Sequence, residues 1–145
     1  MKDAIAINNE ITVATLQVTP EQLHQAVQAG FHSVLNLRSP DEPGFLNDEH
    51  TQAEAAGLHY ENTPVKPMLL DDGLVAQILQ QIERLPKPAL LHCGSGLRAG
   101  LMASLYVAMQ QGWTADRTVA MAQTLGLKWP AQPALKQVCE RACQC

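Results

Sequence analysis

The chain has 145 residues, a formal net charge of −4 and 17% charged side chains. A chain of this length folds by default as one domain and buries roughly 70% of its unfolded surface. The mildly acidic balance, without a basic stripe, excludes a typical nucleic-acid partner. No stretch approaches the ~18 apolar residues of a membrane span, and the N-terminus has no signal-like run. We therefore expect a cytoplasmic domain over residues 1–145 with no membrane partner, whose four cysteines are thiols.

The N-terminal third reads as a strand pair, a helix and a strand. Two apolar runs within residues 5–16 predict a hairpin or edge pair. Residues 19–30 predict a helix in which Thr19 is the cap, a proline follows it, and Gly30 takes the left-handed C-terminal position. SVLNL at 33–37 predicts a buried strand.

The middle of the chain continues the alternation. A loop rich in Pro, Gly and Asp precedes a short helix around 48–56, and an extended run follows at 58–65. The apolar spacing of residues 71–85 predicts an amphipathic helix, capped by Asp71 or Asp72.

The last third begins with a strand and is otherwise helical. PALLHC at 88–93 predicts a short apolar strand, and a largely buried helix begins near Arg98. Residues 114–126 and 133–145 predict two more helices. This alternation of strands and helices is typical of an α/β fold, in which helices cover a mostly parallel sheet.

The most informative segment is HCGSGLR, residues 92–98, between the last strand and its helix. Ligands of open α/β sheets bind at such carboxyl ends. A loop that enters a helix directs backbone N–H groups at one point, and glycines allow a close approach. Arg98 can supply a two-pronged cation for an oxyanion.

We expect these groups to lower the pKa of the Cys93 thiol, while His92 pins the loop. The anion-binding candidates are Gly94, Ser95, Gly96, Leu97 and Arg98. The alternative is an inert buried cysteine before an ordinary turn.

HC…GxxR resembles the signature of cysteine-dependent phosphatases. The stretches FHSVLNLRSPDEPG, EAAGLHYENTPV and PALLHCGSGLRAG resemble the bacterial phosphatase-like domain fused to β-lactamase-like hydrolases and sulfur-metabolism modules. The resemblance covers about residues 10–128. It implies a three-layer fold like that of dual-specificity phosphatases, with a four- or five-stranded sheet. Cys93 would be the nucleophile, Arg98 the anion clamp, and the N–H groups of 94–98 the cradle.

The loop departs from the phosphatase pattern in two ways. Four residues separate Cys93 from Arg98, where such phosphatases have five. The shorter spacing is similar to that of rhodanese-type sulfurtransferases, whose loop surrounds one persulfide sulfur. Ala99 stands where phosphatases usually have a Ser or Thr that helps the thiolate leave.

The general acid is a third departure. The matching loop shows Lys66 and Pro67 where an acidic residue is expected. Asp71 and Asp72 come slightly later and are acid candidates, although helix capping accounts for both.

Other polar residues give weaker signals. Arg38 ends the SVLNL strand, where the resemblance also places an arginine; it supports the site or, as the favoured alternative, forms a surface pair with Asp41 or Glu42. The tail cysteines could bind a metal or exchange persulfide, but a packed helical tail accounts for them: Cys139, Cys143 and Cys145. The other histidines lack ligand-like spacing: His24, His32, His50 and His59.

Three functions remain open: a phosphatase-like hydrolase with a thiophosphoryl intermediate, a sulfurtransferase with a Cys93 persulfide, and an anion-binding regulatory module of low activity. None of them calls for a cofactor or a metal. The partner is accordingly a phosphorylated or sulfur-donor substrate.

Overall fold

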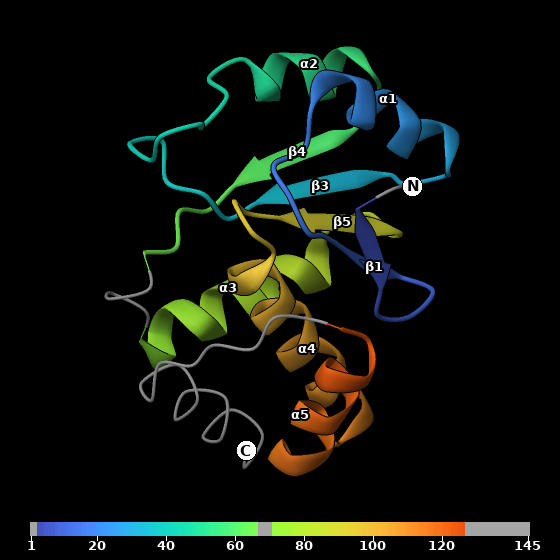
Figure 1. The fold of residues 1–145 in the computed structure, drawn as a ribbon, viewed down its shortest axis with the longest axis vertical. Helices are drawn as coiled ribbons and strands as arrows, with labels where there is room; N and C mark the ends of the chain where they lie inside the picture. Colours follow the sequence, from blue (N-terminus) through green and yellow to red (C-terminus); the bar gives the residue numbers. More distant parts are fainter. Residues whose placement is uncertain (1–2, 67–70, 127–145) are drawn as a thin grey trace.

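The structure, a computed structural model, describes residues 3–66 and 71–126 (Figure 1). Within them lie five strands and five helices. The strands are β1 (Ala4–Ala6), β2 (Ile11–Ala14), β3 (Ser33–Asn36), β4 (His59–Asn62) and β5 (Ala89–His92). The helices are α1 (Pro20–Gln28), α2 (Glu49–Ala55), α3 (Asp72–Arg84), α4 (Leu97–Gln111) and α5 (Ala115–Thr124). The helix predicted at 133–145, with its three cysteines, lies outside the described residues.

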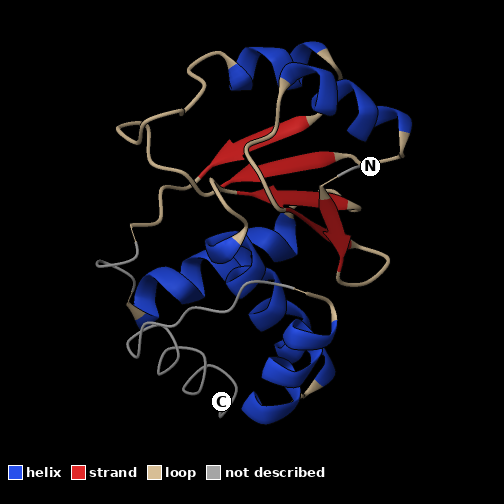
Figure 2. Ribbon diagram, in the orientation of Figure 1, coloured by secondary structure: helices blue, strands red, loops and turns tan. Residues whose placement is uncertain are grey.

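The strands form one mostly parallel sheet in the order β1-β2-β5-β3-β4 (Figure 2). β1 and β2 are antiparallel, as the hairpin prediction requires, and the Asn8 side chain accepts hydrogen bonds from the backbone of Glu10 and Ile11 between them. β2, β5, β3 and β4 are parallel, with Leu91 of β5 opposite Val13 on one side and Leu35 on the other. The predicted α/β fold class is confirmed.

Helices cover both faces of the sheet, which gives three layers (Figure 1). α1 and α2 lie on one face over a smaller apolar core that includes Leu23 and Val34. α3, α4 and α5 lie on the other face over a larger core that includes Ile78 and Leu105. Within the described residues no helix is both long and apolar enough to cross a membrane.

The helix ends follow the sequence signals. Thr19 caps α1 in a reciprocal capping box with Gln22, and Gly30 has the left-handed φ of 96° that ends the turn after it. α4 is different, because every residue from Ala99 to Ala108 is buried. A helix that is apolar on all sides must lie inside the fold, and α4 packs against both α3 and α5.

The segments after β3, β4 and β5 remain paired beyond the strands themselves. Leu37 N–H donates to the carbonyl of His92 at 2.9 Å, and Val65 N–H donates to the carbonyl of Leu37 at 3.0 Å. Three strand ends therefore meet at one edge of the sheet, the carboxyl edge that the α/β fold favours for ligands.

Candidate active site

Cys93 begins the loop that follows the central strand β5. Its side chain is buried and is a free thiol. The loop turns at Gly96, which is the N-cap of α4 and has a φ of 86°. The first N–H groups of any helix lack hydrogen-bond partners within the helix. Those of α4 are therefore available as hydrogen-bond donors to an anion at the loop. The cysteine thus lies beside the amino end of a long, buried helix.

Both loop glycines have close neighbours, and at Gly96 the neighbours leave no room for a side chain. A Cβ at position 96 would lie 3.1 Å from Thr15 Cα, in a backbone conformation that side chains rarely adopt. A Cβ at position 94 would lie 3.5 Å from Cζ of Arg38. Between them Ser95 is exposed, while Leu97 is half-buried at the start of α4. The loop is therefore wedged between the end of β2 and the Arg38 guanidinium.

Arg98, in the first turn of α4, reaches back to the carboxyl edge of the sheet. Its Nη1 donates to the carbonyls of Val65 at 2.8 Å and Leu37 at 3.4 Å. Nη1 and Nη2 also donate to the two carboxylate oxygens of Glu42, at 2.7 and 2.8 Å. The bond to Glu42 chiefly raises the pKa of Arg98, burial opposes it, and Cys93 adds to the rise as a charge and hydrogen-bond partner. The guanidinium is therefore near enough to the Cys93 thiol to interact with it electrostatically.

Glu42, in the loop after β3, is the centre of this arginine side. Besides Arg98, it accepts from Ser39 N–H at 2.6 Å and lies 3.4 Å from Nε of Arg38. The bonds from Arg98 lower the pKa of Glu42 from 4.5 to about 2, although partial burial acts in the opposite direction. Glu42 is thus a fixed anion between two permanent cations.

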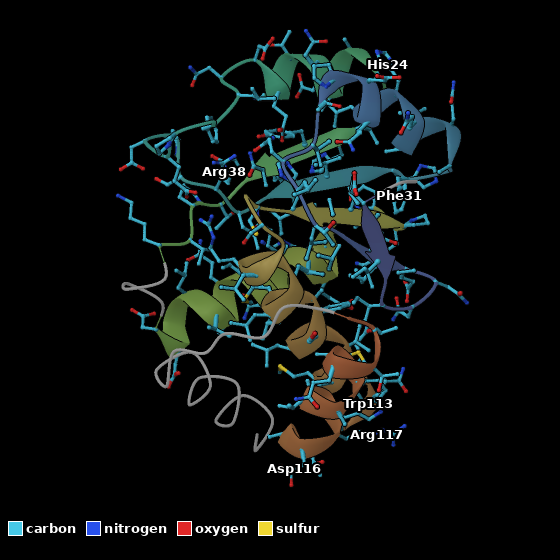
Figure 3. All side chains as sticks on the ribbon, viewed as in Figure 1. His24, Phe31, Arg38, Trp113, Asp116 and Arg117 are labelled. Atoms are coloured by element: carbon cyan, nitrogen blue, oxygen red, sulfur yellow. The ribbon has the colours of Figure 1, made fainter. Side chains whose placement is uncertain are left out.

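Arg38 lies at the carboxyl end of β3, beside the loop (Figure 3). The expected pairing with Glu42 is present, but the expectation of a surface pair is wrong, because only 12% of the Arg38 side chain is exposed. Its other nitrogens donate to the side chain of Gln17 at 2.8 Å and to the carbonyl of Pro43. Arg38 is partly buried because Gly94 and Gly44, in the loop after β3, lie close to its guanidinium.

His92, on the other face of β5, is fully buried and its Nε2 lies 2.6 Å from Oε2 of Glu49. Oε1 of Glu49 accepts from Nε2 of Gln17 at 2.8 Å. The sequence predicts that His92 pins the loop by hydrogen bonding, but it does not indicate Glu49 as the partner. A signal for Glu49 is present: it precedes the buried Ala53 by four residues, which places it on the same inner face of α2.

The acid candidates lie at the start of α3. Asp71 is exposed and its Oδ1 accepts from Leu74 N–H at 2.7 Å, which makes it the helix cap. Asp72 is the exposed first residue of the helix. Lys66 forms an exposed ion pair with Asp41 at 3.0 Å. The pKa of Asp41 is lowered, first by the Ser39 hydroxyl and then by Lys66. Glu42, which binds Arg98, and Asp41, which binds Ser39 and Lys66, are thus both ionised at neutral pH.

Other chemistry-bearing residues stay apart. In residues 3–66 and 71–126 no three His, Cys, Asp or Glu side chains gather as metal ligands. His50 and His59 are each paired with a glutamate on the surface. His24 lies on α1, and Trp113 packs beneath Arg117 at the far end of α4, both away from the strand ends (Figure 3).

Structures of similar fold are phosphatases. Tk-PTP in its active form superposes with a TM-score of 0.83 at 18% identity, over 99% of this chain and 97% of that one. PTPMT1 in complex with PI(5)P superposes with a TM-score of 0.79 at 12% identity, over 99% of this chain and 96% of that one. The likeness defines the class: an α/β domain with the fold of protein-tyrosine-phosphatase-like proteins.

The sequence comparisons define the family within that class. A family model described as "Beta-lactamase hydrolase-like protein, phosphatase-like domain" matches residues 3–111. The chain belongs to this family. It is also 28% identical, over 127 residues, to the Beta-lactamase hydrolase-like protein of Xylella fastidiosa, strain Temecula1. The match covers 84% of this chain but only 29% of that relative's length.

Proposed function

We propose that the chain is a cysteine-dependent phosphatase-like hydrolase. The observation that carries the proposal is the placement of Cys93 just before the amino end of α4, within electrostatic reach of the Arg98 guanidinium. In the first step the Cys93 thiolate attacks phosphorus: an S–P bond forms, the P–O ester bond breaks, and the leaving oxygen departs with the electron pair. Water then attacks phosphorus, which releases phosphate and restores the thiolate.

The charges near the loop favour a particular leaving group. Glu42 and Asp41 hold no proton at neutral pH, because both have lowered pKa values. The sequence between Lys66 and Asp71 includes no acidic side chain. An aryl oxide leaves as a stabilised anion and needs a general acid less than an alkoxide does. We therefore expect aryl phosphates to be better substrates than alkyl phosphates.

A second function, sulfur transfer, is favoured by the loop itself. Four residues separate Cys93 from Arg98, and Ala99 is fully buried where a hydroxyl would assist the thiolate as leaving group. In this reaction the thiolate attacks the outer sulfur of thiosulfate, a persulfide forms and sulfite leaves. An acceptor such as cyanide then takes the sulfur and restores the thiolate. Neither step needs the missing proton donor.

One pair of assays separates the two functions. The wild-type protein and Cys93→Ser are given p-nitrophenyl phosphate, and separately thiosulfate with cyanide. We expect release of nitrophenolate by the wild type and its loss, by about 10³-fold or more, in Cys93→Ser. Thiocyanate formation without nitrophenolate would replace the first function by the second. If neither product forms and Cys93→Ser still binds sulfate, the chain is an anion-binding module.

A further inference from the structure

The residue just before Cys93 is held by a buried hydrogen bond that the proposed chemistry does not use. The side chains of His92 and Glu49 are 0% and 1% exposed, and Nε2 of His92 lies 2.6 Å from Oε2 of Glu49. Charged groups are rarely buried so completely unless they are paired. In the main chain, the His92 carbonyl accepts from Leu37 N–H at 2.9 Å. Both the backbone and the side chain of His92 are therefore fixed.

The contacts around Glu49 have one consistent polarity. The other carboxylate oxygen, Oε1, accepts from Nε2 of Gln17 at 2.8 Å. Oε1 of Gln17 in turn accepts from Nη1 of Arg38 at 2.8 Å. Arg38 can only donate, so the amide of Gln17 cannot flip without placing its NH₂ group against the guanidinium. The NH₂ of Gln17 must therefore face Glu49, and Glu49 must accept.

The same polarity determines where His92 carries its proton. A carboxylate only accepts hydrogen bonds, so Nε2 of His92 is the donor. Nδ1 is buried and has no hydrogen-bond partner among the described residues. A proton on Nδ1 would be a buried donor without an acceptor. The arrangement therefore selects the neutral ring with its proton on Nε2.

We propose that Glu49 is a positioning residue for the cysteine loop: it holds His92 in the Nε2–H tautomer and thereby fixes the backbone that delivers Cys93 to Arg98. The proposal rests on the proposed role of Cys93 as nucleophile. A chain of hydrogen bonds runs from Arg38, at the edge of the site, through Gln17 and Glu49 to His92. One guanidinium thus packs on the loop and also sets the polarity of the contacts behind it.

Glu49→Gln tests this polarity with little change of shape. The new side chain has one acceptor and one NH₂ group, but Gln17 and His92 both offer donors to it. One of the two contacts must be lost, unless His92 moves its proton to Nδ1 so that Nε2 can accept from the new amide. Gln17 keeps its orientation against Arg38, so its NH₂ should hold the new carbonyl and leave the new NH₂ facing His92. We therefore expect the variant to shift His92 towards the Nδ1–H tautomer.

Glu54→Gln is the matched control. Glu54 is on the same helix and also lies 2.6 Å from a histidine, His50, but both side chains are about 60% exposed. Three quantities are measured in the full chain. They are the ring ¹⁵N shifts of His92, the rate at which iodoacetamide alkylates Cys93 followed on its own peptide by mass spectrometry, and kcat and KM with p-nitrophenyl phosphate.

We expect the wild type to show the Nε2–H tautomer. Glu49→Gln should lose it, change the alkylation rate of Cys93 by fivefold or more, and lower kcat about tenfold with KM within twofold. Glu54→Gln should match the wild type in all three. An Nδ1–H tautomer in the wild type overturns the proposal even if Glu49→Gln fails to fold, and so does an unchanged tautomer or an unchanged alkylation rate in a folded variant.

The shifts and the alkylation rate do not depend on turnover, which separates this proposal from the proposed function. If the wild type releases neither nitrophenolate nor thiocyanate, the enzymatic function fails. The tautomer and the alkylation rate still decide the role of Glu49.

Discussion

Two carboxylates, Glu42 and Glu49, support the cysteine loop from opposite sides. They differ in their exposure and in whether their partner side chain has a fixed protonation state. Glu42 is a quarter exposed and lies between Arg98 and Arg38, two side chains that are always protonated. Glu49 is buried and faces His92, a ring that can carry its proton on either nitrogen. On the arginine side the charges are permanent, and Glu42 determines only where the guanidinium groups lie. On the histidine side the hydrogen bond to Glu49 determines which ring nitrogen of His92 carries the proton.

The difference separates two tasks that a thiolate site requires. In the proposed function the arginine side would supply positive charge for a bound oxyanion, and Glu42 orients that charge by accepting hydrogen bonds from both Nη atoms of Arg98. The histidine side lies on the opposite face of β5 and supplies no group to the anion. It orients the backbone that leads into Cys93. A substitution on the first side should weaken anion binding and chemistry together, while one on the second should act mainly on kcat.

Apart from the loss of Cys93 itself, the largest effect is expected from Arg98→Lys. A lysine ammonium keeps the charge, but it cannot bridge both oxygens of Glu42 and also present a planar fork to an oxyanion. We expect kcat/KM for p-nitrophenyl phosphate to fall about 10²–10³-fold. Arg117→Lys is the control, because Arg117 packs on Trp113 at 4.7 Å, far from the loop; its kcat/KM should stay within twofold. A loss of less than fivefold in Arg98→Lys would mean that Arg98 serves Glu42 and not the substrate.

The second effect is a pH-dependent stability carried by Glu42. Its pKa is lowered from 4.5 to about 2, so the unfolded chain takes up this proton at a higher pH than the folded protein. The contribution is therefore complete above about pH 5.5 and is lost as pH falls towards 2. The shift corresponds to at most about 3 kcal/mol, which solvent screening at a partly exposed carboxylate reduces to about 1–2 kcal/mol.

Glu42→Gln isolates that contribution. The free energies of unfolding of wild type and variant are measured in urea at pH 7, 5 and 3. The variant should be less stable by about 1–2 kcal/mol at pH 7, and the gap should narrow steadily at the lower pH values. A gap that is the same at all three values would show that the ion pair with Arg98 does not carry the stability.

The elements could be predicted because their signals are local. The cap at Thr19, the glycine at position 30 and the apolar spacing of residues 71–85 each act within one turn or one helix, and α1 and α3 form where they indicate. The loop after β5 was also predictable, since a cysteine, two glycines and an arginine at a helix start form one short motif. Short-range signals therefore gave the layers and the central residues of the site.

The partners of those residues could not be predicted from local signals. Glu42 meets Arg98 across 56 positions of sequence, and Glu49 meets His92 across 43. Only the parallel pairing of β3 with β5 brings the loop after β3 and the helix that follows it to the cysteine loop. The spacing of Glu49 and Ala53 is a local signal for the inner face of α2, but the partner of Glu49 is a property of the assembled sheet.

The smallest effect on stability and turnover is expected at Asp71, which belongs to neither the Glu42 nor the Glu49 contacts. Asp71 caps α3 by accepting from Leu74 N–H, and asparagine is an equally good cap. Asp71→Asn should therefore change the free energy of unfolding by less than about 0.5 kcal/mol and leave turnover within twofold, whereas Asp71→Ala should lose about 1 kcal/mol of stability with turnover again unchanged. The two substitutions separate capping from acid catalysis, because only alanine removes the cap and both remove the proton. A tenfold loss of turnover in a fully stable Asp71→Asn would identify Asp71 as the general acid and restore alkyl phosphates as substrates.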